Sequence, residues 1–247
     1  MTKVDHYAQI LQTLTDWDSY LLQNSGLAGP RGNIELGRAF ARLADETAIE
    51  KYLSYSADVA PVNSPYEFLA FCGVLGLGRL VVEGQRERLA VLRHKASDPR
   101  WRIREGVAMA LQQFGCADMP ALVEEMKRWV HGGLMEKRAV AAALCEPVLL
   151  QEQWIVQHVL DILDQITGSI KQASDRKSEE FRVLRKALGY CWSVAVAARP
   201  EMGKVRMEKW MNEKDRDIRW IMKENLRKNR LLRMDGKWVA KWLERLG

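Results

Sequence analysis

The sequence predicts an all-α protein built from stacked, antiparallel helix pairs. Three observations carry this prediction. Apolar residues recur with a period near 3.6 in almost every segment, the breaks between segments are short, and one helical pattern returns along the chain. No run of alternating β-branched residues competes with the helical period. A short helix cannot bury its apolar face alone, so helices separated by short breaks are expected to pack in pairs.

Helix starts carry chemical signals in the first half of the chain. The run Ser64-Pro65-Tyr66-Glu67 predicts a capping box, with Ser64 as the N-cap, Pro65 at the first helical position and Glu67 reaching back. Asp98-Pro99 repeats this pattern before a helix that we expect to run to about Phe114. In order along the chain, the predicted helices cover residues 4–23, 33–44, 45–56, 65–75, 79–96, 99–114, 119–131, 134–146, 151–166, 178–199, 201–212, 215–229 and 236–246.

An internal repeat is visible in the second part of the chain. The segment that begins Ile103-Arg104-Glu105-Gly106-Val107 is matched at its hydrophobic, basic and small positions by segments around Lys137, Arg185 and Arg219. An acidic residue stands six positions before three of the four basic residues: Asp98, Glu179 and Glu213. His131 takes this position before Lys137.

An acidic residue followed by a basic residue on the second helix of a hairpin resembles the HEAT repeat. This resemblance implies a right-handed α-α superhelix, that is, a HEAT-like or armadillo-type solenoid, with a hydrogen-bonded ladder between neighbouring repeats. We expect a single solenoid domain over residues 1–247. In it, residues 1–95 form degenerate N-terminal helices and residues 96–246 form the HEAT-like repeats.

Composition narrows the environment of the protein. No uninterrupted apolar run approaches the ~20 residues that cross a bilayer, and the first residues lack the apolar core of a signal peptide. The four widely spaced cysteines are expected to be reduced core thiols. We therefore expect a cytoplasmic protein without a membrane partner; the sequence leaves its oligomeric state open.

Positive charge is concentrated near the C-terminus. The formal net charge is +6, and the whole excess falls within residues 201–247, where Lys and Arg outnumber Asp and Glu. Such a surplus can attract the phosphates of a nucleic acid, although a solvated helix surface has the same composition.

Most enzyme signatures are missing from the sequence. It contains no His-Glu-x-x-His, no P-loop, no Gly-x-Ser-x-Gly and no Cys/His cluster with zinc spacing, so we predict neither a metal nor another cofactor. The glycines of Cys72-Gly-Val-Leu-Gly-Leu-Gly78 are expected to serve helix packing or a turn.

Tryptophan is the unusual ingredient, since eight of the nine lie after residue 100. Large aromatic rings stabilise helix packing, and they can also stack on bases or attract a cationic methylated base. Trp101 and Glu105 are four residues apart and share one helix face, where a carboxylate could stabilise positive charge on a sugar during base loss.

A second resemblance concerns Lys186-Ala187-Leu188-Gly189-Tyr190. It is similar to a late helix of the AlkD-type DNA glycosylases, HEAT-like solenoids that bind DNA in a basic concave groove and excise cationic alkylated purines. That family uses aromatic rings and an Asp four residues after a Trp. The resemblance implies Trp101 and Tyr190 as base-stacking rings, with Trp192 beside them, and Glu105 as the catalytic acid. In this chain, Glu105 stands where the family has an Asp, and Tyr190 stands where it has a Trp.

The basic residues that could neutralise phosphates fall in two groups. Around Trp101 they are Arg100 and Arg102. In the C-terminal part, one helical stripe is predicted from Arg216, Lys223, Arg227 and Arg230 together with the ladder residue Arg219. We therefore expect a DNA-binding HEAT-like protein related to the alkylation-repair glycosylases, its catalytic activity open. The alternative is a non-catalytic scaffold that binds a protein partner, in which Trp101 would be buried.

Overall fold

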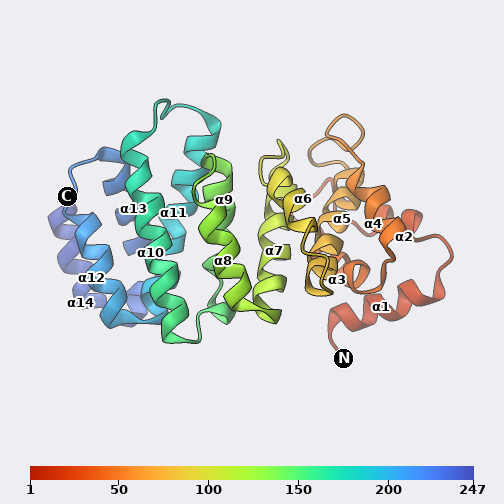
Figure 1. Cartoon of the computed structure of the whole chain (residues 1–247), viewed down its shortest axis with the longest axis horizontal. Coiled ribbons are helices and arrows are strands. Elements are labelled where there is room, and N and C mark those ends of the chain that lie inside the picture. The colour runs from red at the N-terminus through yellow and green to blue at the C-terminus, as the bar shows by residue number, and fades with distance from the viewer. The chain divides into compact units, whose positions relative to one another are not determined.

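The computed structural model describes residues 1–247 and contains helices without strands (Figure 1). The bounds of the helices are α1 Lys3–Thr13, α2 Trp17–Gln23, α3 Ile34–Leu43, α4 Glu46–Leu53, α5 Pro65–Val82, α6 Arg88–Lys95, α7 Trp101–Ala117, α8 Met119–Trp129, α9 Leu134–Leu144, α10 Gln153–Ser169, α11 Glu179–Ala198, α12 Pro200–Met211, α13 Arg216–Leu226 and α14 Asn229–Leu246. Two short 3-10 turns are η1 Pro147–Leu149 and η2 Ile170–Gln172. The all-α prediction is confirmed.

The chain divides into two compact units, unit 1 at Met1–Ala117 and unit 2 at Asp118–Gly247. The expected change of character at residue 95/96 is not a packing boundary, because α7 packs along α5 inside unit 1. The prediction of one solenoid domain over the whole chain stays a prediction.

Side-chain caps explain where several helices begin. Asp16 caps α2 by accepting from the amide of Ser19, which divides the single helix predicted over 4–23 into α1 and α2. Ser64 caps α5 as predicted, accepting from the amide of Glu67. The Glu67 carboxylate reaches back one residue further than expected, to the amide of Asn63 at 2.7 Å.

Helix α5 extends through the glycines at which a break was predicted. A Cβ on Gly76 would meet the side chain of Ile49 at 2.6 Å, and one on Gly78 would meet the backbone of Ala110 at 2.8 Å. These glycines let neighbouring helices approach closely, so they serve packing and do not end the helix.

Unit 1 is assembled around α5, which packs against α2, α3, α4, α6 and α7, while α1 packs on α3. With 18 residues and a mean hydropathy of 1.4, α5 is long and apolar enough to cross a membrane, but 78% of it is buried within the protein. Packing against five helices accounts for its apolar character.

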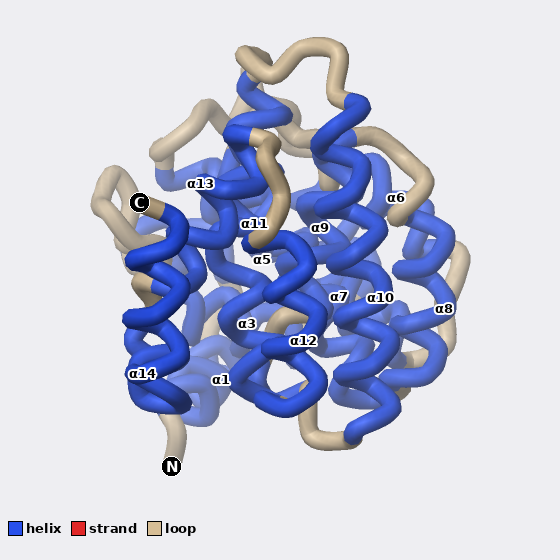
Figure 2. The backbone as a smooth tube through the Cα atoms, turned by 90° about the vertical axis from the view of Figure 1, so that its left-hand side faces the viewer, coloured by secondary structure: helices blue, strands red, loops and turns tan.

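Unit 2 is assembled around α11, which packs against α9, α10, α12, α13 and α14. Figure 2 shows α11 and α13 labelled side by side, in agreement with their extensive packing. Trp192 in α11 is fully buried and donates its indole N–H to the hydroxyl of Thr167 at 2.9 Å.

One basic residue of the repeat pattern, Arg185, forms an ion pair between neighbouring helices of unit 2. Arg185 of α11 donates to Asp217 of α13 at 2.5 Å, and Asp217 is almost completely buried. Glu213, the acid that the sequence pattern places six residues before Arg219, binds Lys171 at 2.6 Å. The bond between these neighbouring helices is therefore made by Asp217, four residues after Glu213.

Candidate functional site

Trp101 and Glu105 line a common pocket in unit 1. Both lie on the first turns of α7, and the pocket has a volume of about 310 Å³. Its walls are largely apolar, with Phe68 and Phe71 from α5 and Met109 from α7. Trp101 is 46% exposed, whereas a buried ring was the expectation for a scaffold protein.

The Glu105 carboxylate is half-buried at this pocket, one helical turn from the indole of Trp101. The guanidinium of Arg102 lies 4.4 Å from the centroid of the Trp101 ring. A planar ring that enters the pocket would therefore meet aromatic walls, a carboxylate and a guanidinium.

Arg100, predicted to contact DNA, is used inside unit 1. Only 1% of it is exposed, and it makes a bidentate ion pair with Asp98 at 2.9 and 2.8 Å. Its remaining terminal nitrogen donates to the carbonyls of Tyr55, Ser56 and Ala60. Because no donor is left at the surface, the structure removes Arg100 from the nucleic-acid contacts.

Arg102 is also directed into the protein. It binds the fully buried Glu67 at 3.0 Å and donates to the carbonyl of Gly29 and to the side chain of Asn63. Arg102 is one of the residues that line the pocket, and its charge is paired with Glu67. Both terminal nitrogens of Arg102 are thus occupied inside the protein, and the structure adds no support for the predicted phosphate contact.

Trp192, predicted to stack on bases, has no exposed surface. It lies on the interior side of α11, where a ring of this size fills the core of unit 2. The neighbouring Gly189 is also explained by packing, since a Cβ there would meet Glu224 and Trp220 at 3.2 Å. Within the Lys186–Tyr190 motif, the residues that face outward are Lys186 and Tyr190.

Tyr190 is 45% exposed and contacts Arg230. The Arg230 guanidinium lies 4.7 Å from the centroid of the Tyr190 ring and donates to the Tyr190 hydroxyl. Sequence reasoning selected both residues, and the structure brings them together from α11 and α14.

The basic stripe predicted from residue 216 to residue 230 is interrupted. Helix α13 ends at Leu226 and α14 starts at Asn229, so Arg227 lies at the C-cap of α13 and Arg230 in the first turn of α14. Arg216 is exposed at the start of α13, whereas the half-buried Lys223 donates to the carbonyl of Gly247.

Sequence reasoning missed a second stripe, on α11. Arg182, Lys186 and Tyr190 are spaced by four residues, all three are exposed, and neither Arg182 nor Lys186 has a carboxylate partner. The i, i+4 spacing was visible in the sequence, but the exposed side of α11 was not.

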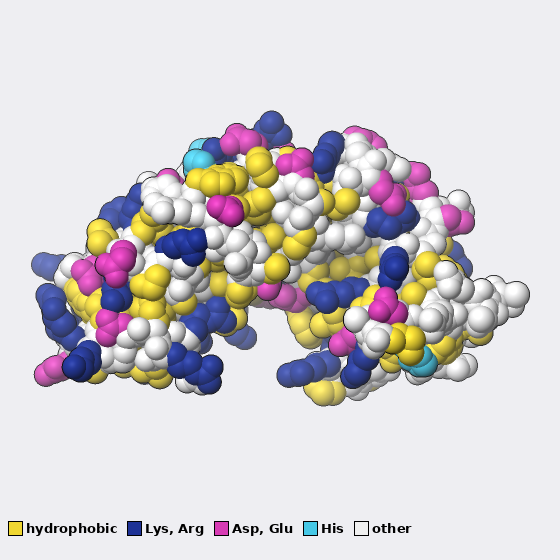
Figure 3. Space-filling model, turned by 90° about the horizontal axis from the view of Figure 1, so that it is seen from below, with side chains coloured by type: hydrophobic (Ala, Val, Ile, Leu, Met, Phe, Trp, Pro, Cys, Tyr) yellow, Lys and Arg dark blue, Asp and Glu magenta, His cyan; other side chains and the backbone are white.

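The excess of positive over negative residues lies entirely in unit 2. Unit 1 contains 13 Lys and Arg against 13 Asp and Glu, and unit 2 contains 25 against 19. On the face drawn in Figure 3, Lys and Arg side chains gather over the helices of unit 2 at the left. The full net charge of +6 is therefore carried by unit 2.

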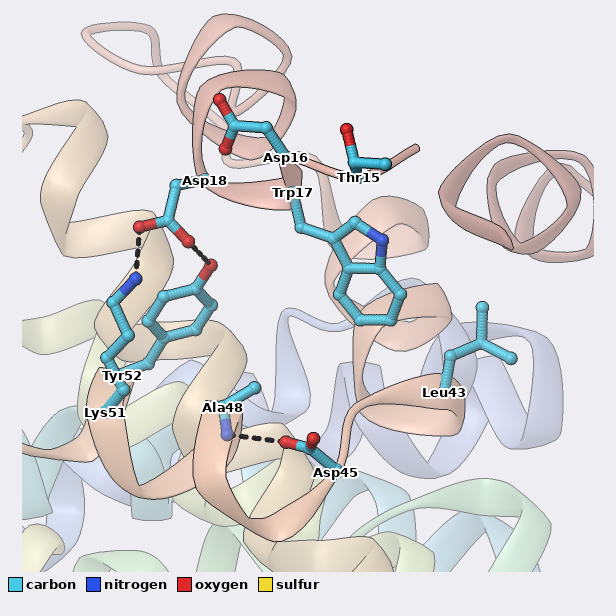
Figure 4. Close-up of a pocket in the computed structure, with 9 residues that line it drawn as sticks. All are labelled: Thr15, Asp16, Trp17, Asp18, Leu43, Asp45, Ala48, Lys51 and Tyr52. Carbon is cyan, nitrogen blue, oxygen red and sulfur yellow. Dashed lines mark hydrogen bonds and ion pairs between the residues drawn. The ribbon is translucent and has the colours of Figure 1, made fainter. Parts of the chain in front are cut away.

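A further surface pocket of about 720 Å³ lies in unit 1 between α2 and α4 (Figure 4). Its carboxylates are already used. Asp45 accepts from the amide of Ala48, and Asp18 binds Lys51 and the hydroxyl of Tyr52 at 2.5 and 2.6 Å. Burial, together with the hydrogen bond to Asp18, raises the pKa of Tyr52. No group of three His, Cys, Asp or Glu side chains in the chain is arranged to hold a metal ion.

Comparison with known proteins identifies the fold. No protein-family model matches the chain, and no curated protein matches it in sequence. Among solved structures, the crystal structure of AlkD2 from Streptococcus mutans matches with a TM-score of 0.61 and 18% sequence identity, covering 85% of this chain and 96% of AlkD2. The chain therefore has the AlkD-like HEAT-repeat fold that was predicted from its sequence.

Proposed function

We propose that this protein binds DNA through the basic surface of unit 2 and is a relative of the alkylation-repair glycosylases. The AlkD-like fold supports the family assignment, and the positive charge of unit 2 supports a polyanionic ligand. Lys and Arg that lie near phosphates release counterions on binding, which gives affinity that falls steeply with salt.

One observation carries the proposal: the exposed stripe Arg182–Lys186–Tyr190 leads to Arg230, and its two cations lack carboxylate partners. The eight helical steps from Arg182 to Tyr190 span about 12 Å. This length is sufficient to meet more than one phosphate of a strand whose charges recur every ~3.4 Å. The exposed ring adds a surface on which a base can stack.

The test is the salt dependence of binding to a short fluorescent duplex, followed by anisotropy. Replacing Arg182 and Lys186 by Gln is expected to lower affinity and to reduce the log–log salt slope by about 1.8, that is, by about 0.9 for each lost phosphate contact. The matched control replaces Lys127 and Arg128 by Gln, which changes the net charge by the same amount. These two residues are paired with Glu124 and Glu125. The control is expected to keep the wild-type slope. Absence of binding at low salt by the folded protein would falsify the proposal.

Glycosylase activity is a second candidate function, and it is favoured by the common pocket of Trp101 and Glu105. In this mechanism the aromatic walls contact a cationic alkylated purine and the Glu105 carboxylate stabilises positive charge on the sugar as the base departs. The experiment measures base release from duplex DNA that carries a methylated purine, with Glu105→Gln as the control variant. If wild type and Glu105→Gln release base equally slowly, the protein binds DNA without this activity.

The alternative function, a protein-binding scaffold, has a separate signature. A stoichiometric protein partner that survives nuclease treatment, together with absent DNA binding, would support it. We propose a cytoplasmic location, which is supported by four free cysteines, three of them buried.

A further inference from the structure

A second basic pocket lies in unit 2 where α13 ends and α14 begins. It has a volume of about 450 Å³ and is open to solvent on one side. Its lining consists of Tyr190, Arg227, Lys228, Asn229, Arg230 and Arg233. Four cationic side chains, one aromatic ring and one amide therefore converge, with no carboxylate in the lining.

Charge pairing at this pocket differs from that of several other arginines in unit 2. Elsewhere, Arg176 and Arg206 each bind two carboxylates. At the pocket, the carboxylate of Glu224 is shared, since it lies 2.7 Å from Arg227 and 3.9 Å from Lys228.

Arg230 and Arg233 have no carboxylate partner. The polar contact of Arg230 is the neutral hydroxyl of Tyr190, and Arg233 is exposed. Two guanidinium groups thus line one pocket without a carboxylate to balance their charge. This arrangement is unfavourable unless an anion occupies the site or solvent screens it.

We propose that this pocket binds a terminal phosphate monoester at the end of a DNA strand, an inference that rests on the proposed DNA binding. An internal phosphodiester carries one negative charge, whereas a monoester carries about 1.5 to 2 at neutral pH and offers three acceptor oxygens. Guanidinium groups bind such oxygens in a bidentate manner. The two guanidinium groups without a carboxylate partner, those of Arg230 and Arg233, therefore match the charge of a monoester better than that of an internal phosphodiester.

Tyr190 can contact both the phosphate and the base of a terminal nucleotide. Its oxygen accepts from Arg230, which leaves the phenolic O–H free to donate to a phosphate oxygen. Its ring is 45% exposed, so the base next to the terminal phosphate can stack on the exposed part. The pocket volume lies within the range of about 300 to 1,000 Å³ that is usual for small ligands, so one nucleotide fits.

The experiment compares the affinity of the folded protein for three duplexes of one sequence, with a 5′-phosphate, a 3′-phosphate or hydroxyl groups at the ends. One phosphorylated form is expected to bind about tenfold more tightly than the hydroxyl form, which corresponds to one additional charge-assisted contact. Arg230→Gln combined with Arg233→Gln is expected to abolish this preference. Tyr190→Phe keeps the ring but removes the phenolic O–H, so it is expected to reduce this preference.

Arg182→Gln combined with Lys186→Gln is the matched control, because it removes two charges from the α11 stripe outside the pocket lining. This variant is expected to weaken all three duplexes equally and to keep the preference. Equal affinity of the wild-type protein for the three duplexes overturns the monoester site but leaves DNA binding intact. Absence of binding to all three overturns the proposed function as well. Circular dichroism of each variant verifies that it is folded.

Discussion

Replacing Arg100 by Met is expected to destabilise unit 1 without weakening a phosphate contact. The guanidinium is almost fully buried and makes five side-chain hydrogen bonds, two to Asp98 and three to backbone carbonyls. Met has a similar length and fills most of the space, so the loss is mainly electrostatic.

The magnitude follows from the groups left behind. Removing one partner of a buried ion pair costs about 3 to 5 kcal/mol, because the other charge stays desolvated. The carbonyls of Tyr55 and Ser56 are only partly buried and can bind water, so they add little. We expect the free energy of unfolding to fall by about 4 kcal/mol. Arg42→Met breaks an exposed pair with Asp5 and should cost less than about 1 kcal/mol.

The assay is urea denaturation followed by circular dichroism, for the wild type, Arg100→Met, Arg42→Met and the double variant with Asp98→Asn. The double variant should recover part of the loss, since no buried charge is left unpaired. A second measurement is the salt slope of DNA binding, which Arg100→Met should leave unchanged while the protein is folded. A loss below about 1 kcal/mol would contradict the buried ion pair, and a slope reduced by about one would show that Arg100 contacts phosphate.

Three further outcomes are expected. Burial acts to raise the pKa of Asp98, but the hydrogen bonds from Arg100 outweigh it and hold the pKa below its ordinary value of 3.8. The stability contributed by Asp98 is therefore complete above about pH 4 and is lost as the pH falls through the lower pKa of the folded state, so acid unfolding of Asp98→Asn should be shallower than that of the wild type. Gly189→Ala should cost about 1 to 3 kcal/mol in thermal or urea unfolding, because the new Cβ would meet Glu224 at 3.2 Å. Trp192→Phe should cost about 1 to 3 kcal/mol, because it removes the bond to Thr167 from the core, and an unchanged Kd for DNA would agree with its burial.

The sequence alone was sufficient for the helical class and for most helix positions, because helical periodicity and capping chemistry are local properties. It misplaced the break in α5, where Gly76 and Gly78 serve contacts with helices distant in sequence. It also joined α1 to α2, although Asp16 carried a capping signal.

For the candidate sites, too, the sequence predicts some features and only the structure shows the others. The four-residue spacing of Trp101 and Glu105 fixed their common helix face, and the structure adds the pocket that both residues line. The sequence pattern of an arginine beside a tryptophan is the same whether the arginine is exposed or buried. Only the packing of α7 in unit 1 shows that Arg100 is paired with Asp98 and Arg102 with Glu67.

Sequence by itself therefore determined which residue types lie one helical turn apart, because this follows from the geometry of a single helix. Tertiary structure decided which of those faces meets solvent and which charges are already neutralised. Both depend on contacts between segments far apart in the chain. The stripe from Arg182 to Tyr190 and its meeting with Arg230 belong to this second kind of information.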